Sequence, residues 1–382
     1  MYRVWLELKK IISLPAVWAL IAACLVLNAL IVFSISGDSY ADYVGATSRQ
    51  TGFILGEEYN ARLGQIQADA SQADYKNRLQ AETSGMIDVF EGYQTGYIAK
   101  RYISYLGLTG RAAEDMRNKY ASLQQAVNEK AENDESKTLY FAGSTYSQHC
   151  NLYGALMRWL LVEGVLTSVL VVLLSVGHEY FNHTEQIVYA AKTGRRILRS
   201  KLSAALIAGC GVYVLLSLLT LSGYFIMNDS AGIWGSSVSS GFNYINDIIA
   251  GARPYVTWHS FTVSTYLLAS MGLSAGIVLC CSLFGFVIGI LIRNGYLGFL
   301  VFIILCASCV AIPMILPDNS YAKFVFVLSP VCLWWKQLYW FTDGGFDILW
   351  KNFETVGLSA SLILAALLCP LSFAWFRKRD IA

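Results

Sequence analysis

A short polar stretch, residues 177–201, contains most of the side chains whose types and spacing could do chemistry. His178, Glu179 and His183 are the residue types of a zinc-metalloprotease helix. The two histidines of such a helix lie four positions apart and share one face. Here they are five positions apart, so they do not share a face and we predict no metal site. With four histidines in the whole chain, we also find no local signature of Ser/His/Asp catalysis.

Nucleotide chemistry is equally unsupported by local motifs. The sequence contains no Gly-x-x-x-x-Gly-Lys-Ser/Thr loop, the motif whose backbone amides hold nucleotide phosphates. We therefore expect no ATP bound in this way, no catalytic residues and no cofactor held by the chain itself.

Two polar residues lie inside apolar runs. Glu163 is an ionisable residue about a turn and a half inside such a run, which makes it a functional-site hypothesis by default. The alternative is a structural pair with Arg158, or with a polar group on a neighbouring helix, and the sequence does not decide between them. For Asn28 we expect a hydrogen bond between two helices.

The elements that position these residues must lie in a membrane. The 382 residues are 55% apolar and 14% charged, whereas soluble domains have about 25% charged residues. Several apolar runs exceed the roughly 18 residues that a spanning helix needs. We predict an all-α polytopic membrane protein with six spans, at about 16–36, 155–177, 202–227, 262–292, 296–316 and 356–376.

Three parts follow along the chain. Residues 1–36 should form a helix lying in the membrane interface and then the first span, because apolar residues recur at helical spacing before Pro15. Residues 37–150 read as a helical extracellular domain, with an amphipathic helix over 111–132. Residues 151–382 should form a five-span membrane domain in which segment 178–201 is cytoplasmic.

Charge sets the expected orientation. If the amino terminus is inside, the short inner segments carry twelve Lys and Arg against four acids, a net charge of +8. Cytoplasmic loops are the ones enriched in Lys and Arg. We therefore place the chain in the cytoplasmic (cell) membrane with both termini inside and residues 37–150 outside.

Other patterns concern packing. Gly272-x-x-x-Gly276 and Gly285-x-x-x-Gly289 should let another helix approach closely. Seven of the nine cysteines lie in apolar runs, and a disulfide between Cys150 and Cys332 is left open. The aromatic residues of loop 317–355 are expected to form an outer interfacial belt.

The polar stretch also carries a resemblance. The stretch contains a pattern of four features. A glutamate follows the second span, a threonine lies five positions later, and a Gly-Arg pair is followed by a further base before the third span. The residues are Glu179, Thr184, Gly194–Arg195 and Lys201. This pattern, with the six-span layout and the large segment after span one, resembles the permease subunits of ABC-2 type ABC transporters. The layout is similar to their sodium-exporter and peptide-immunity branch. His183 departs from the pattern, because a glycine usually precedes the threonine.

The resemblance implies a permease that works with a separate ABC ATPase subunit, which would hold ATP and Mg, and with a second permease copy or homologue as a dimer. Segment 178–201 would then be the coupling helix. In it, Glu179 and Thr184 are expected to cap a helix, and Ile187 and Val188 to offer an apolar face. The coupling residues on this interpretation are Glu179, Thr184, Glu185, Ile187, Val188, Arg195 and Arg196.

Alternatives stay open. The bases around Arg199 could instead hold the segment against anionic membrane lipid. The chain could be a membrane sensor or scaffold whose ectodomain binds a ligand without transport. An intramembrane enzyme is disfavoured, because no paired Asp or Ser/His motif lies in a span. Nucleic acid is not an expected partner, and the sequence does not identify a substrate.

Overall fold

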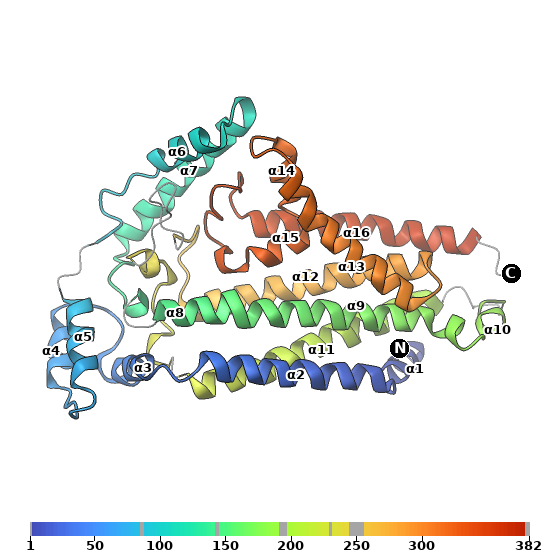
Figure 1. Ribbon diagram of the computed structural model, residues 1–382, viewed down its shortest axis with the longest axis horizontal. Coiled ribbons are helices and arrows are strands. Elements are labelled where there is room, and N and C mark those ends of the chain that lie inside the picture. Colours follow the sequence, from blue (N-terminus) through green and yellow to red (C-terminus); the bar gives the residue numbers. More distant parts are fainter. Residues whose placement is uncertain are drawn as a thin grey trace.

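The computed structural model describes residues 2–84, 88–141, 145–190, 197–228, 231–243 and 256–378. Within these ranges the chain is mostly helical and forms no sheet, only isolated bridges. Long helices run side by side through the molecule, and a group of shorter helices lies at one end (Figure 1).

In the described ranges, six helices are long and apolar enough to cross a membrane, which confirms the prediction of an all-α polytopic protein. The second comprises α8 (Thr145–His149), η2 (Cys150–Leu156) and α9 (Met157–Phe181), which follow one another without a break. The other five are α2 (Pro15–Ile35), α11 (Ile197–Met227), α12 (Val263–Leu291), α13 (Gly295–Ile315) and α16 (Phe353–Lys378).

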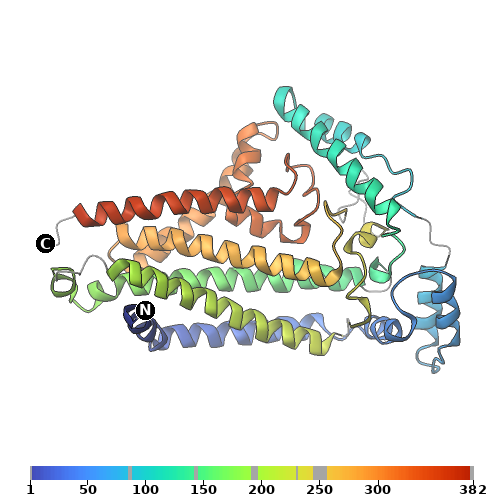
Figure 2. The same ribbon diagram turned by 180° about the vertical axis from the view of Figure 1, so that it is seen from behind.

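Helix α9 is the centre of the bundle. Two-thirds of its most apolar window is buried, against 17% for α13 and 22% for α16. It packs against α2, α11, α12 and α13, while α16 packs against α12 (Figure 2). Hydropathy does not explain this burial, because α2 and α13 are more apolar and less buried; the position of α9 between four other spans does.

Glycines allow two of these contacts to be close. If Gly285 of α12 were replaced by a residue with a Cβ atom, that atom would lie 3.0 Å from Val169 of α9. A Cβ at Gly289 would lie 3.2 Å from Leu173 of the same helix. Gly276, further along the same helix, faces Leu358 of α16 instead. Gly272 has no neighbour within 4 Å. The two predicted motifs therefore serve two different neighbouring helices, and one of the four glycines makes no close contact.

Helix α1 (Tyr2–Ile12) packs against α9 and α11 at the end opposite the short helices. Its buried side chains are Glu7 and Ile11, whereas Trp5 and Ile12 are about half exposed. The helical pattern predicts Glu7 on the polar face, away from the apolar residues. It is instead turned into the protein, because a buried lysine of α11 lies there.

The described parts of the region 37–150 include five helices, α3 (Ser39–Thr51), α4 (Glu57–Gln65), α5 (Ala73–Thr83), α6 (Gly96–Leu106) and α7 (Gly110–Glu132). The core of this region is not closed within its own residues. Tyr120 and Met116 of α7 share a buried cluster with Trp258, Phe324 and Leu349, which come from the loops between later spans. The short helices therefore fold against the membrane domain's own loops.

The aromatic residues of loop 317–355 do not all lie in a belt. Trp340 is fully buried, and its indole N–H donates to the carbonyl of Leu333. Trp334 donates to the carbonyl of Arg158 in α9 at 2.9 Å. Trp335 is 59% exposed. The exposed Trp335 fits the expected interfacial belt, but Trp340 belongs to the core. The expectation of a belt was therefore wrong for part of this loop.

Candidate functional site

Four charged side chains meet at the end of the bundle that carries α1 and α10 (Glu185–Ala190), called here the α10 end. Lys201 of α11 is fully buried and pairs with the Glu179 carboxylate, also buried, at the end of α9. Its ammonium also donates to the carbonyl of Ser175 at 2.5 Å. Glu7 lies 3.8 Å from Lys201 and 2.8 Å from Lys10, which in turn lies 3.7 Å from Glu179.

These four residues, the inner ion cluster, tie three elements together. Glu7 and Lys10 belong to α1, Glu179 to α9 and Lys201 to α11. Two acids and two bases balance, so the cluster carries no net charge. A buried ion pair adds little net stability, but removing one partner leaves an uncompensated charge and costs about 3–5 kcal/mol. The cluster therefore fixes how these helix ends lie relative to one another.

Helix α10 projects beyond this cluster between α9 and α11. The backbone N–H of Val188 donates to the carbonyl of Thr184 at 3.0 Å, so Thr184 stands just before the first turn. Its hydroxyl reaches back to the carbonyl of Glu179 at 3.5 Å. Tyr189 is buried against Phe376 of α16, with ring centroids 5.2 Å apart. One face of α10 is thus fixed to the bundle.

The opposite face of α10 is open. The side chain of Ile187 is 77% exposed, as is that of Phe181 at the end of α9. Glu185 and Val188 are half-buried. Of the predicted coupling residues Glu179, Glu185 and Ile187, Glu179 is an interior residue, Glu185 is half-buried with one carboxylate oxygen buried, and Ile187 is exposed. Arg195 and Arg196 lie outside the residues that the structure describes.

A second polar site lies within the spans. The amide of Asn28 in α2 donates to the Glu163 carboxylate of α9 at 2.7 Å, and both side chains are buried. This confirms the interhelical hydrogen bond expected for Asn28. Arg158 does not pair with Glu163, because its guanidinium donates to the carbonyl of Trp335. The second carboxylate oxygen of Glu163 and the nearby Thr167 hydroxyl have no partner among the described residues.

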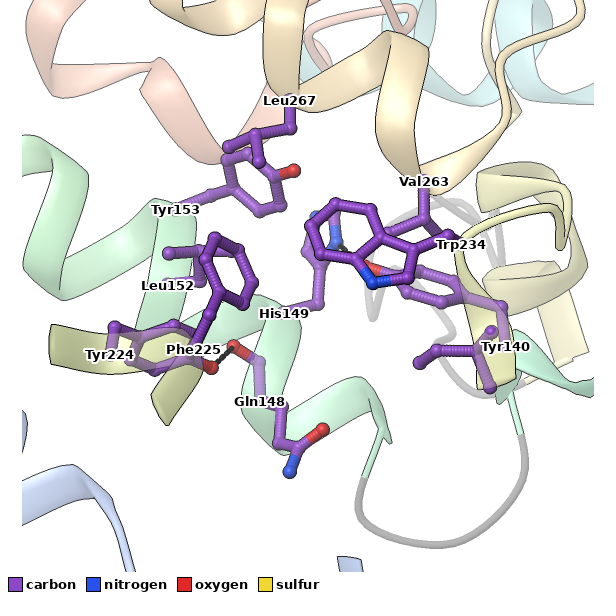
Figure 3. A pocket seen from close by; sticks show the side chains of 11 residues that line it. Tyr140, Gln148, His149, Leu152, Tyr153, Tyr224, Phe225, Trp234, Val263 and Leu267 are labelled. Atoms are coloured by element: carbon purple, nitrogen blue, oxygen red, sulfur yellow. Dashed lines mark hydrogen bonds between the residues drawn. The ribbon is translucent and has the colours of Figure 1, made fainter. Parts of the chain in front are cut away.

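Figure 3 shows an aromatic cluster at the other end of α9 that the sequence analysis did not single out. The Tyr140 hydroxyl contacts Nδ1 of His149, and the ring of Tyr153 lies 4.5 Å from the His149 ring. The cavity between them is about 20 Å³, room for one water molecule. It is too small for a substrate. The density of Tyr and His over 139–153 was the available signal.

The described residues contain no group of three His, Cys, Asp or Glu side chains that could hold a metal ion. Cys150 and Cys332 are not joined by a disulfide in the structure. Comparison with known proteins adds no assignment: no family model, curated protein or solved structure matches this chain.

Proposed function

We propose that this chain is the membrane-spanning permease subunit of an ATP-driven exporter of the ABC-2 type. A separate ATPase subunit would hold ATP and Mg and act on the chain through α10. The observation that carries the proposal is the geometry of α10. It joins two central spans, is fixed to the bundle on one side by Tyr189, and exposes Ile187 on the other.

The inner ion cluster supports a mechanical role for this segment. The cluster connects the ends of α1, α9 and α11, and α10 packs against α9. A displacement of α10 that moves the end of α9 would therefore move the ends of three helices together rather than bend a loop. Rigid-body movement of packed elements is a common way of coupling one site to another. Work done on α10 by a partner could in this way reach the centre of the bundle.

A second copy of the chain fits the same proposal. Helices α13 and α16 are the least buried of the later spans, and both expose apolar side chains over most of their length. In a membrane these faces meet either lipid or another permease. We propose a dimer of permeases with two ATPases, in the cell membrane, with α10 and both termini on the cytoplasmic side.

Ile187→Asp combined with Glu185→Lys tests the docking surface. We expect the wild-type chain, purified from its native membrane, to bring down a protein that carries a nucleotide loop and hydrolyses ATP. The double variant should lose it, because an aspartate cannot enter an apolar groove and the charge at residue 185 is reversed. Copurification is measured by ATP hydrolysis per mole of permease.

The matched control is Tyr296→Asp, an exposed residue at the start of α13 on the same end of the bundle. It should retain the ATPase. If the double variant retains the ATPase as well, α10 is not the docking site. A wild-type chain that purifies with no ATPase activity would favour the sensor or scaffold function.

A further inference from the structure

An apolar cavity of about 260 Å³ lies between α9, α12, α13 and α15 (Pro330–Trp335). Its walls include Val165, Cys306 and Trp334, and its exposed lining surface is wholly apolar. Several lining residues, among them Val165 and Cys306, are partly exposed, so the cavity opens on the surface of the bundle. For comparison, a cavity of about 150 Å³ with apolar walls stays free of water and binds benzene.

The cavity lies at membrane depth. From Arg158 to Glu179 is a rise of about 32 Å at 1.5 Å per residue, close to the roughly 30 Å of a bilayer's hydrocarbon core. Arg158 and the inner ion cluster therefore mark the two boundaries. The cavity begins at Leu161, one turn below Arg158. It opens where a membrane presents acyl chains rather than water.

Arg158 supplies a charge close to this cavity, about one helical turn before the lining residue Leu161 of α9. Its guanidinium donates to the carbonyl of Trp335 at 3.1 Å and lies 5.5 Å from the Trp335 ring. No acidic side chain pairs with it in the described parts of the chain. Guanidinium carries five N–H donors in a planar fork that suits phosphate. Here one Nη2–H is used and the Nε–H is buried, which leaves the donors of Nη1 and the second N–H of Nη2.

The two features are directly joined. Trp334 forms part of the cavity wall and donates its indole N–H to the carbonyl of Arg158. A cation without an acidic partner at the boundary suits an anionic headgroup, and an apolar cavity one turn deeper suits an acyl chain. An anionic phospholipid carries both. We propose that Arg158 and this cavity form a binding site for one anionic phospholipid, with its phosphate on Arg158 and one acyl chain between α9 and α13.

The proposal concerns the leaflet on the side of α3–α7 and does not depend on the exporter assignment. Its test uses the full-length chain in detergent, analysed by native mass spectrometry after addition of dioleoyl phosphatidylglycerol. We expect one tightly retained lipid. Dioleoylglycerol, which lacks the phosphate, should bind at least tenfold more weakly, and glycerol 3-phosphate, which lacks the chains, should not compete.

Two substitutions separate headgroup from chain. Arg158→Ala should weaken phosphatidylglycerol binding at least tenfold and remove the preference over dioleoylglycerol. Cys306→Phe should weaken both lipids, because it fills the cavity. Arg158→Lys keeps the positive charge but loses the planar guanidinium, so its affinity for phosphatidylglycerol should lie between those of wild type and Arg158→Ala. If Arg158→Ala does not fold, Arg158→Lys takes its place in the test.

Controls use matched residues elsewhere. Arg293→Ala removes another arginine that lies over an aromatic ring, at 5.7 Å from Tyr180. Leu367→Phe enlarges an outward-facing residue of α16 that is 62% exposed. Both should bind phosphatidylglycerol like wild type. Unchanged binding in Arg158→Lys and Cys306→Phe, or equal loss in the two controls, would overturn the proposal.

Discussion

Single polar side chains join elements that are distant in the sequence. Lys119 of α7 is nearly fully buried and donates to the carbonyls of Asp343, Gly345 and Ile348, at 2.8–2.9 Å. The neighbouring Tyr120 hydroxyl donates to the Asp343 carboxylate at 2.5 Å. Because buried polar groups are costly without partners, these contacts fix α7 onto the loop between α13 and α16.

Replacing Glu163 tests the polar contact inside the spans. Glu163→Leu leaves the Asn28 amide without an acceptor, and we expect a loss of about 1 kcal/mol in stability, typical of hydrogen bonds between membrane helices. Glu163→Gln keeps an acceptor oxygen and should stay near wild type. Thermal unfolding in detergent measures both.

Thr167→Val is the matched control for Glu163, since it is buried one turn further along α9 and its hydroxyl has no partner in the described chain. It should change the unfolding temperature little. If Glu163→Leu unfolds at or above the wild-type temperature, the Asn28 contact does not stabilise the bundle.

Lys119 should make stability depend on pH. Burial lowers the pKa of Lys119 from 10.5 to about 8, although the charges of Asp343 and Asp347 oppose the shift and Lys336 adds to it. Above pH 8 the folded protein releases this proton while the unfolded chain keeps it. The titration of Lys119 therefore makes the free energy of unfolding rise with pH, by about 2 kcal/mol between pH 8 and 9.5.

The measurement compares wild type with Lys119→Met from pH 7 to 9.5. Burial raises the pKa of Tyr120 well above 10. In the folded protein this tyrosine therefore stays protonated up to pH 9.5, the end of the measured range. The stability of wild type relative to Lys119→Met should rise with pH. Lys100→Met, at an exposed lysine of α6, should follow wild type. A constant or falling relative stability would contradict the buried-ammonium interpretation.

Elements that depend on local composition were predictable. All six spans fall within a few residues of the expected ranges, apart from the amino-terminal extension of the second span by η2 and α8, and the earlier starts of α11 and α16. Hydropathy decides spans because backbone and side chains must suit lipid over about 20 consecutive residues. The same argument placed Asn28 and Glu163 in the bundle.

Features that depend on distant partners were not predictable. Glu7 looks like a polar-face residue of α1, and only Lys201 of α11, far along the chain, explains its burial. Trp340 looks like an interfacial aromatic, but it is buried in a cluster that includes residues of α9 and α12. Glu179 was identified as a coupling residue, yet its partner lies in α11. Pairing across helices leaves no local signature.

Lys201→Met tests the inner ion cluster. The change leaves Glu7 and Glu179 without their shared cation, and we expect destabilisation of about 3–5 kcal/mol. Replacing both members of the closest pair, Glu179→Leu with Lys201→Leu, keeps the Glu7–Lys10 pair and should cost less than Lys201→Met alone. Unfolding temperatures of the two variants give the comparison.

An exposed pair provides the control for this cycle. Arg62 and Glu58 in α4 are 2.5 Å apart, but both side chains are at least half exposed. Arg62→Met should cost less than about 1 kcal/mol. If the double variant of the inner cluster is less stable than Lys201→Met, the two residues contribute independently and do not act as one pair.

At the scale of the molecule, the two ends of the bundle differ in kind. One end carries α3–α7, packed on the loops between later spans through Lys119 and the buried aromatic residues. The other carries α1, α10 and the inner ion cluster. The sequence places short basic segments at this second end, so the positive-inside rule predicts that it faces the cytoplasm.

Labelling of introduced cysteines tests this orientation. Glu114→Cys in α7 and Gln186→Cys in α10 place thiols on exposed residues at opposite ends. The half-buried cysteines are first replaced by serine, and these are Cys150, Cys210, Cys306 and Cys309.

In intact cells, a membrane-impermeant maleimide should label the Glu114→Cys variant and not the Gln186→Cys variant, since α7 is expected outside. After the membrane is opened, the second variant should label as well, because its thiol was protected by location and not by burial. Ser122→Cys on α7 and Ser200→Cys on α11 repeat the comparison at less exposed positions. Labelling of both ends from the same side would contradict a six-span topology, since six crossings put residues 114 and 186 on opposite faces of the membrane.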